Sequence, residues 1–199
     1  MSVFHAAWLI ALVGLVVLSA WIGKQSGQGY LGILFDGRAR YSLTHFQIVV
    51  WTLVILSSAI GALIATGFDP SKIVISPQLL GLMGISAGSA VLATGVKGSK
   101  DADPASNVAR TGTFTLSNGT QTTIAPRFAQ IWLEEEGDQA DKTISITKYQ
   151  NFIFTLVAIA FYVTLAWNKG GLPDLPENAV WLIGISHAGY VGGKVPDKK

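Results

Sequence analysis

The chain has no cysteine and few charged residues, and both shortages restrict what it can be. In 199 residues there is no Cys, and Asp, Glu, Lys and Arg together make up only 13%. Without Cys there can be no disulfide framework, thiolate nucleophile, Cys-ligated zinc or iron–sulfur cluster. A soluble domain of this size usually carries about 25% charged residues. We therefore interpret the chain as an integral membrane protein.

Residue patterns for catalysis and for nucleic-acid binding are also missing. The formal net charge is only +2, too small to indicate a nucleic-acid partner. The sequence holds no Ser/His/Asp set, no pair of carboxylates within an apolar run and no phosphate-binding glycine loop. Its three histidines, His5, His45 and His187, are expected at different depths, so they cannot meet at one metal. We expect no enzyme activity, no catalytic residues, no metal and no cofactor.

Apolar residues are abundant instead. Half of the chain comes from the hydrophobic set, and the mean hydropathy is +0.45. A membrane-spanning helix needs about 20 apolar residues. Five stretches meet or approach that length and predict an all-α transmembrane fold with five spans: Val3–Ile22, Phe46–Phe68, Pro77–Val96, Asn151–Trp167 and Pro176–Val195.

The basic residues predict how these spans are oriented. Loop 23–45, segment 97–150 and the C-terminal tail hold twelve Lys and Arg, whereas the opposite side holds only Lys72 and Lys169. Basic residues collect on the cytoplasmic side of membrane proteins. The sequence therefore predicts an outside N-terminus, a cytoplasmic C-terminus and a multi-pass protein of the bacterial inner membrane.

Two halves of the chain repeat one another. Ser42–Gln47 reads SLTHFQ and Ser145–Gln150 reads SITKYQ, while Leu82–Ser86 and Leu182–Ser186 share the pattern LxGIS at a similar offset. Two spans per repeat return the chain to the same side, so the repeats are tandem and parallel. The expected organisation is a first transmembrane helix with its linker at 1–30, repeat 1 at 31–98, a cytoplasmic segment at 99–130, and repeat 2 with a basic tail at 131–199.

Some of the shared residues are suited to starting helices. Ser42 and Ser145 precede spans two and four, where a serine oxygen can accept the free amides of the first turn. Pro77 and Pro176 lie where spans three and five begin, a position at which a missing N–H costs little. We predict all four as helix caps.

Other shared residues are expected near the middle of the membrane. Small residues spaced four apart let helix backbones approach closely, and the hydroxyls bond either to their own helix or to a pore or ligand. A histidine at depth is either a neutral helix-to-helix donor or a group facing a wet cavity. The predicted packing or pore residues are Gly84, Ser86, Gly88, Gly184, Ser186 and His187.

Gln47 and Gln150 hold matching places near the starts of spans two and four. A glutamine at the membrane interface usually hydrogen-bonds to a neighbouring helix. The alternative is a role in selectivity or gating.

The segment between the repeats differs in character from the spans. Residues 111–123 alternate polar and apolar around Ser117-Asn118-Gly119-Thr120, which predicts a small cytoplasmic β-hairpin with a tight turn. An acidic run follows at 134–141, which we interpret as a solvated surface or a docking patch.

The motifs around Tyr41–Gln47, Leu82–Gly88 and Ile183–Tyr190 carry a resemblance. With its SLxxFQ and LxGIS motifs, the chain resembles a loose group of bacterial integral membrane proteins that has no assigned activity. The resemblance covers residues 31–195. It implies a multi-pass membrane fold and brings no catalytic residues.

Two functions fit these patterns. The first is a structural subunit or anchor of a larger membrane assembly, docked through segment 101–144. The alternative is a homo-oligomeric channel or conduit lined by small and polar residues of spans three and five. Both imply the lipid bilayer and either identical or different subunits as partners.

Overall fold

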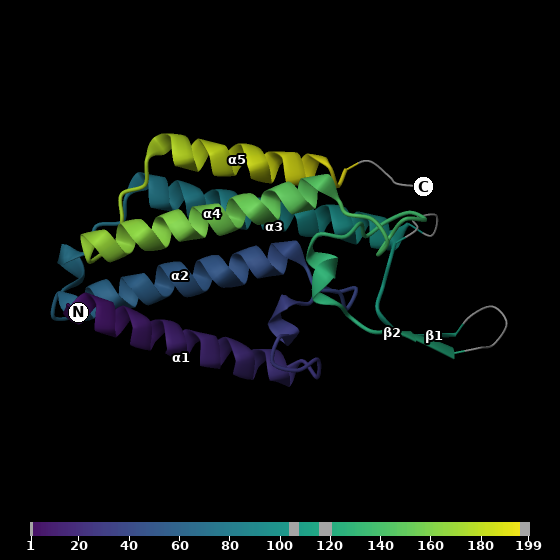
Figure 1. The fold of residues 1–199 in the computed structure, drawn as a ribbon, viewed down its shortest axis with the longest axis horizontal. Coiled ribbons are helices and arrows are strands. Elements are labelled where there is room, and N and C mark those ends of the chain that lie inside the picture. The colour runs from purple at the N-terminus through teal and green to yellow at the C-terminus, as the bar shows by residue number, and fades with distance from the viewer. Residues whose placement is uncertain (1, 104–107, 116–120, 196–199) are drawn as a thin grey trace.

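Five helices lie side by side in the computed structural model, which describes residues 2–103, 108–115 and 121–195 (Figure 1). They are α1 (Val3–Gln25), α2 (Leu43–Ala65), α3 (Pro77–Ala102), α4 (Ile146–Lys169) and α5 (Glu177–Gly192). Three short 3-10 helices, η1 (Gly32–Leu34), η2 (Pro70–Lys72) and η3 (Phe128–Ile131), lie in the connections. Strands β1 (Gly112–Thr115) and β2 (Gln121–Ile124) complete the described elements.

Helices α1 to α4 are long and apolar enough to cross a membrane, which confirms the predicted multi-pass class. Helix α5 begins one residue after the predicted start and has 16 residues. At 1.5 Å per residue it is about 24 Å long, less than a hydrocarbon core of about 30 Å. The structure thus supports four spans by length, and the fifth predicted span is a shorter helix beside them.

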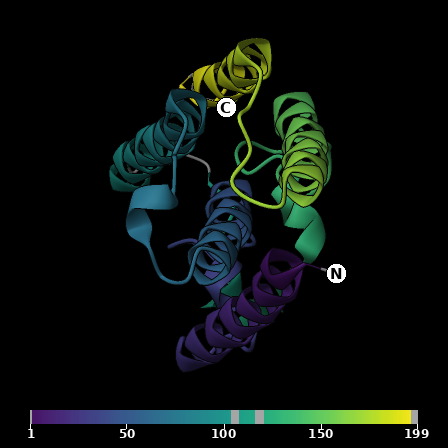
Figure 2. The same cartoon turned by 90° about the vertical axis from the view of Figure 1, so that its left-hand side faces the viewer.

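The bundle is a ring of four helices with α1 on its edge. Seen along the helix axes, α2 lies between α3 and α4, and α5 closes the far side (Figure 2). Helix α2 contacts α3 and α4, and α5 contacts the same two helices. Helix α1 packs on α2, where Gly61 lies opposite the backbone of Trp8.

The connections between the helices lie at two opposite ends of the bundle. The loops 66–76 and 170–176 lie at the end that holds the N-terminus (Figure 1). Segment 26–42 and the described residues of the connection between α3 and α4 (103, 108–115 and 121–145) lie at the other end, which is also where α5 finishes. We call this second end the loop-rich end.

The two halves start in the same way. Helix η1 is followed by a backbone bridge between Phe35 and Tyr41 and then by α2. Helix η3 is followed by a bridge between Leu133 and Ile144 and then by α4. A short bridged turn therefore precedes both α2 and α4, and it sets the residue at which each helix begins.

The predicted caps form only in part. The Ser42 hydroxyl accepts from the His45 amide at 3.5 Å. Ser145 precedes α4, but it makes no side-chain cap, so the prediction for that side chain is wrong. Its hydroxyl instead lies 3.3 Å from the Thr147 hydroxyl. This contact competes with capping of the backbone amides. Pro77 is the first residue of α3, and Pro176 stands one residue before α5.

The predicted hairpin is confirmed as an antiparallel pair. Gly112 pairs with Ile124 and Thr115 with Gln121. The predicted turn, residues 117–120, lies outside the described residues. The two strands project beyond the bundle at the loop-rich end (Figure 1).

Candidate functional site

A buried group of charges joins the helix ends to the loops at the loop-rich end, and Glu135 lies at its centre. The Glu135 carboxylate is 2.9 Å from Lys97 Nζ and 3.5 Å from Lys148 Nζ, and it also accepts from Lys194 Nζ. These lysines come from the last part of α3, the first turn of α4 and the residues just after α5. One carboxylate thus holds three lysines from three parts of the bundle.

Asp36 extends this group into the first half. Lys97 Nζ lies 2.5 Å from the Asp36 carboxylate, so Lys97 bridges Asp36 and Glu135. We refer to Asp36, Lys97, Glu135, Lys148 and Lys194 as the ionic cluster. Their side chains are between 7% and 13% exposed.

Local backbone geometry places the two acids. Asp36 follows Phe35 of the first backbone bridge, and its Oδ1 accepts from the amides of Arg38 and Arg40 at 3.0 and 3.3 Å, which closes a turn. Glu135 lies two residues after Leu133 in the second bridge, and its own carbonyl accepts from the Ala109 amide. Both carboxylates therefore lie within the turn that precedes a long helix.

Further ion pairs surround the cluster. Arg38 Nε donates to Asp101 at 2.9 Å, Arg40 bonds Asp141 at 2.5 Å, and Lys100 bonds Glu136 at 2.6 Å. Both arginine side chains are 1% exposed. The prediction of a solvated acidic run is therefore wrong for Glu135, Glu136 and Asp141, because basic side chains cover them.

The positive neighbours stabilise the charged forms of both acids. Burial raises the pKa of Glu135, but Lys148, Lys97 and Lys194 outweigh burial and hold that pKa well below its ordinary range. Burial also raises the pKa of Asp36, and Lys97 more than offsets it. Within the cluster three lysines face two carboxylates, which favours the ionised form of both acids.

A stability loss in acid follows from these two groups. A carboxyl whose pKa is lowered by folding stabilises the fold above its unfolded pKa, near 4, and loses that contribution as the pH falls through the folded value. We expect the melting temperature in detergent to fall between about pH 5 and pH 3, as the unfolded state takes up protons that the two ionised acids of the fold do not. Melting curves across this range test it, and a Glu135→Gln variant should show a shallower acid dependence. A wild-type melting temperature that rises below pH 4 would contradict the arrangement.

Polar side chains also join the helices inside the bundle. Gln47 donates to Thr155 Oγ1 at 2.6 Å, which joins α2 to α4 as predicted for a glutamine at this place. Gln150 is exposed, and the next residue, Asn151, takes the inward position. Further side-chain bonds between helices include Trp8–Ser57, Ser58–Tyr162, Thr44–Tyr190, Ser89–His187 and Asn151–Ser186.

The predicted midmembrane residues divide into two groups. Ser86, Ser186 and His187 are buried inside the chain, and His187 Nδ1 lies 2.6 Å from Ser89 Oγ on α3. Gly84 and Gly88 face outward, and a side chain added at either would meet no atom of the described chain within 4 Å. Gly184 faces Ile85, with 3.4 Å between an added Cβ and that side chain. The predicted close packing at Gly84 and Gly88 is therefore not made within the chain.

Sequence reasoning did not find the ionic cluster. Lys97, Lys148 and Lys194 were expected only as markers of the cytoplasmic side, because each lies at the end of an apolar run. A signal does exist: an acid follows the short element in each half, at Asp36 and Glu135. A lysine closes each half, at Lys97 and Lys194.

The described residues contain no group of three or more His, Asp or Glu side chains placed to hold a metal ion. Comparison with known protein families, with curated proteins and with solved structures gave no match. What the cluster can do is therefore judged from its geometry, which fastens loops to helix ends.

Proposed function

We propose that the chain crosses the membrane five times, with its N-terminus outside and its loop-rich end in the cytoplasm. Helix α5 lies beside α3 and α4 along the bundle (Figure 1), and membranes adapt to short helices by local thinning at a modest cost. The excess of basic residues lies at the loop-rich end, in accord with the positive-inside rule. In a bacterium this orientation fits the inner membrane.

The same proposal includes two tandem repeats. The matching turns before α2 and α4 support it, as do the buried faces of these helices. Thr44, Gln47, Trp51, Ser58 and Ala62 on α2 correspond to Lys148, Asn151, Thr155, Tyr162 and Ala166 on α4 at a constant offset of 104. The sequence echo SLTHFQ/SITKYQ has an offset of 103, so the inward faces match after a shift of one residue.

The chain acts, in this proposal, as a structural subunit that anchors a larger membrane assembly. One observation carries it: Glu135 in the extramembrane segment binds lysines from α3, from α4 and after α5. Buried ion pairs with several partners fix a single arrangement more than they add stability. The residues around Glu135 are thereby fastened to the helix ends, as a docking platform in segment 101–144 requires.

The projecting strands supply an edge for that platform. Among the described strands, β1 and β2 pair only with each other. A two-stranded ribbon is marginally stable alone, and an open strand edge commonly receives a strand from a partner. Other subunits of the assembly are the proposed partners, together with further copies of this chain along the outward small residues of α3, Gly84 and Gly88.

The channel alternative has less support, because the polar residues predicted to line it are buried within the chain. Ser86, Ser186 and His187 are 7%, 6% and 3% exposed, and the latter two bond to other helices of the same chain. Ser186 and His187 cannot line an axis between copies without breaking these contacts.

A flux measurement separates the two functions. Purified protein in lipid vesicles should show proton and potassium flux at background, and His187→Ala should lower the melting temperature without changing flux. Gating of flux by pH that His187→Ala abolishes would overturn the anchor. Ser99→Ala, at an exposed position on α3, serves as a neutral control.

A further inference from the structure

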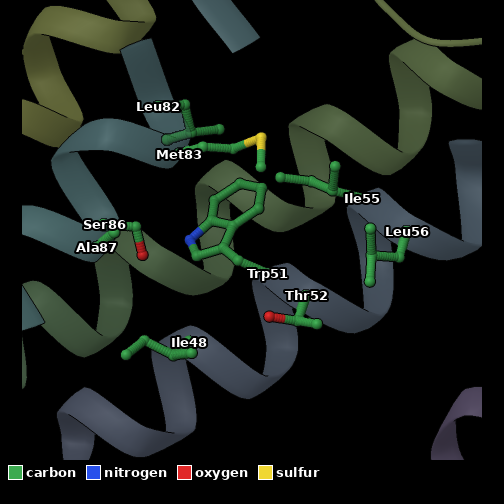
Figure 3. Close-up of a pocket in the computed structure, with 9 residues that line it drawn as sticks. All are labelled: Ile48, Trp51, Thr52, Ile55, Leu56, Leu82, Met83, Ser86 and Ala87. Atoms are coloured by element: carbon green, nitrogen blue, oxygen red, sulfur yellow. The ribbon is translucent and has the colours of Figure 1, made fainter. Parts of the chain in front are cut away.

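An apolar groove opens between α2 and α3, within the first half of the chain. It has a volume of about 260 Å³, and Trp51 forms its floor (Figure 3). Ile48, Thr52 and Leu56 of α2 form one wall, and Met83 and Ala87 of α3 form the other. None of the residues that line it is charged.

Two polar groups at the floor of this groove lack hydrogen-bond partners among the residues that the structure describes. The indole Nε1 of Trp51 is buried and donates no hydrogen bond in the described chain. Its nitrogen edge is turned toward the Ser86 hydroxyl, and no hydrogen bond joins the two (Figure 3). A buried donor without an acceptor is costly, so an acceptor at this place would be stabilising.

In the second half of the chain, the equivalent serine hydroxyl has a hydrogen-bond acceptor. Ser186 corresponds to Ser86 in the LxGIS motif, and its hydroxyl donates to Asn151 Oδ1 at 3.1 Å. In the first half, Gln47 matches Asn151 in helix position, but it bonds Thr155 instead. Ser86 is left facing the groove.

The groove also limits what can occupy it. Ser86 lies nine residues after Pro77, about 14 Å along α3. Phospholipid ester and headgroup oxygens stay at the edges of a core about 30 Å thick, so only their chain carbons reach this depth. A whole helix, about 10 Å across, does not fit within a volume of about 260 Å³. The occupant is therefore a small molecule that brings its own acceptor.

We propose that this groove binds a small, uncharged, largely apolar molecule with a ketone or quinone oxygen, which enters from the bilayer. The oxygen accepts from Trp51 Nε1 and from Ser86, while the apolar body packs between Met83 and Ile55. The inference does not depend on the anchoring function.

Binding of menadione, a two-ring naphthoquinone, tests the proposal. Equilibrium dialysis of the purified protein in detergent, against matched empty micelles, should show saturable binding. Ser86→Ala and Trp51→Phe each remove one hydrogen bond and should weaken it roughly 3- to 10-fold. Ala87→Leu, at an exposed position on the groove wall, should block it while leaving the core intact.

Two controls make the result decisive. Ser186→Ala removes the equivalent hydroxyl of the second half and should leave affinity unchanged. 2-Methylnaphthalene has the same rings without the oxygens and should bind at least 3-fold more weakly. Absence of saturable binding, equal binding of the two compounds, or affinity unaffected by Ser86→Ala and Ala87→Leu would each overturn the proposal.

Discussion

Glu135→Gln should lower the free energy of unfolding by about 3–5 kcal/mol, the usual cost of breaking a buried ion pair from one side. The substitution keeps the shape of the side chain but removes the charge that three lysines share. Lys148 would then lose the carboxylate that lies 3.5 Å from its ammonium group, while keeping the bond to the Leu133 carbonyl at 2.8 Å. We expect low yield and a melting temperature in detergent far below that of the wild type.

A matched exposed ion pair provides the control for this prediction. Asp174 lies 2.6 Å from Lys169, and both side chains are at least 49% exposed. Asp174→Asn should therefore change stability by no more than about 1 kcal/mol. If the two variants melted at the same temperature, the cluster would not be holding the helix ends together.

Gly61→Leu should separate α1 from the rest of the bundle. A Cβ at Gly61 would lie 3.0 Å from the N, Cα and Cβ atoms of Trp8, so the helices have no room for a side chain. The displacement would also break the hydrogen bond from Trp8 Nε1 to Ser57, now 2.9 Å. Overpacking costs about 1–3 kcal/mol, and we expect faster proteolysis between α1 and α2 with a lower melting temperature.

Gly14 provides the comparison, because it lies on the exposed side of α1 and a side chain there would meet no atom within 4 Å. Gly14→Leu should leave the melting temperature and the proteolysis pattern close to those of the wild type. A Gly61→Leu protein that behaves like Gly14→Leu would mean that α1 does not pack on α2 through this contact.

The long helices could be predicted from sequence because their physical signal is simple. Runs of about 20 apolar residues have few other stable states in a bilayer, and α1 to α4 lie where those runs are. The ends were less certain. The apolar run begins at Phe46, but α2 begins three residues earlier, at Leu43. The Ser42 hydroxyl caps the first turn of the helix there.

The inward faces of α2 and α4 needed the structure. Gln47 and Gln150 match in sequence, but only Gln47 points inward. A shift of one residue along a helix turns a side chain by about 100°. Sequence similarity alone therefore does not reveal that the two glutamine side chains face different directions.

The ionic cluster could not be predicted because its members lie close together in space but far apart in the sequence. Glu135 lies 38 residues after Lys97 and 59 before Lys194 along the chain. Sequence patterns predict an acidic run as solvated. Burial of Glu135 depends on three helix ends meeting at one place, which requires the packed bundle.

The mass of the assembly extracted from its own membrane tests the anchoring function most directly. Native mass spectrometry of the tagged chain, 21.1 kDa alone, should show it together with different subunits. These should be lost when residues 112–124 are replaced by a short Gly-Ser link, while the bundle still melts as in the wild type. A closed ring of this chain alone, unchanged by that replacement and conducting ions in vesicles, would contradict the account.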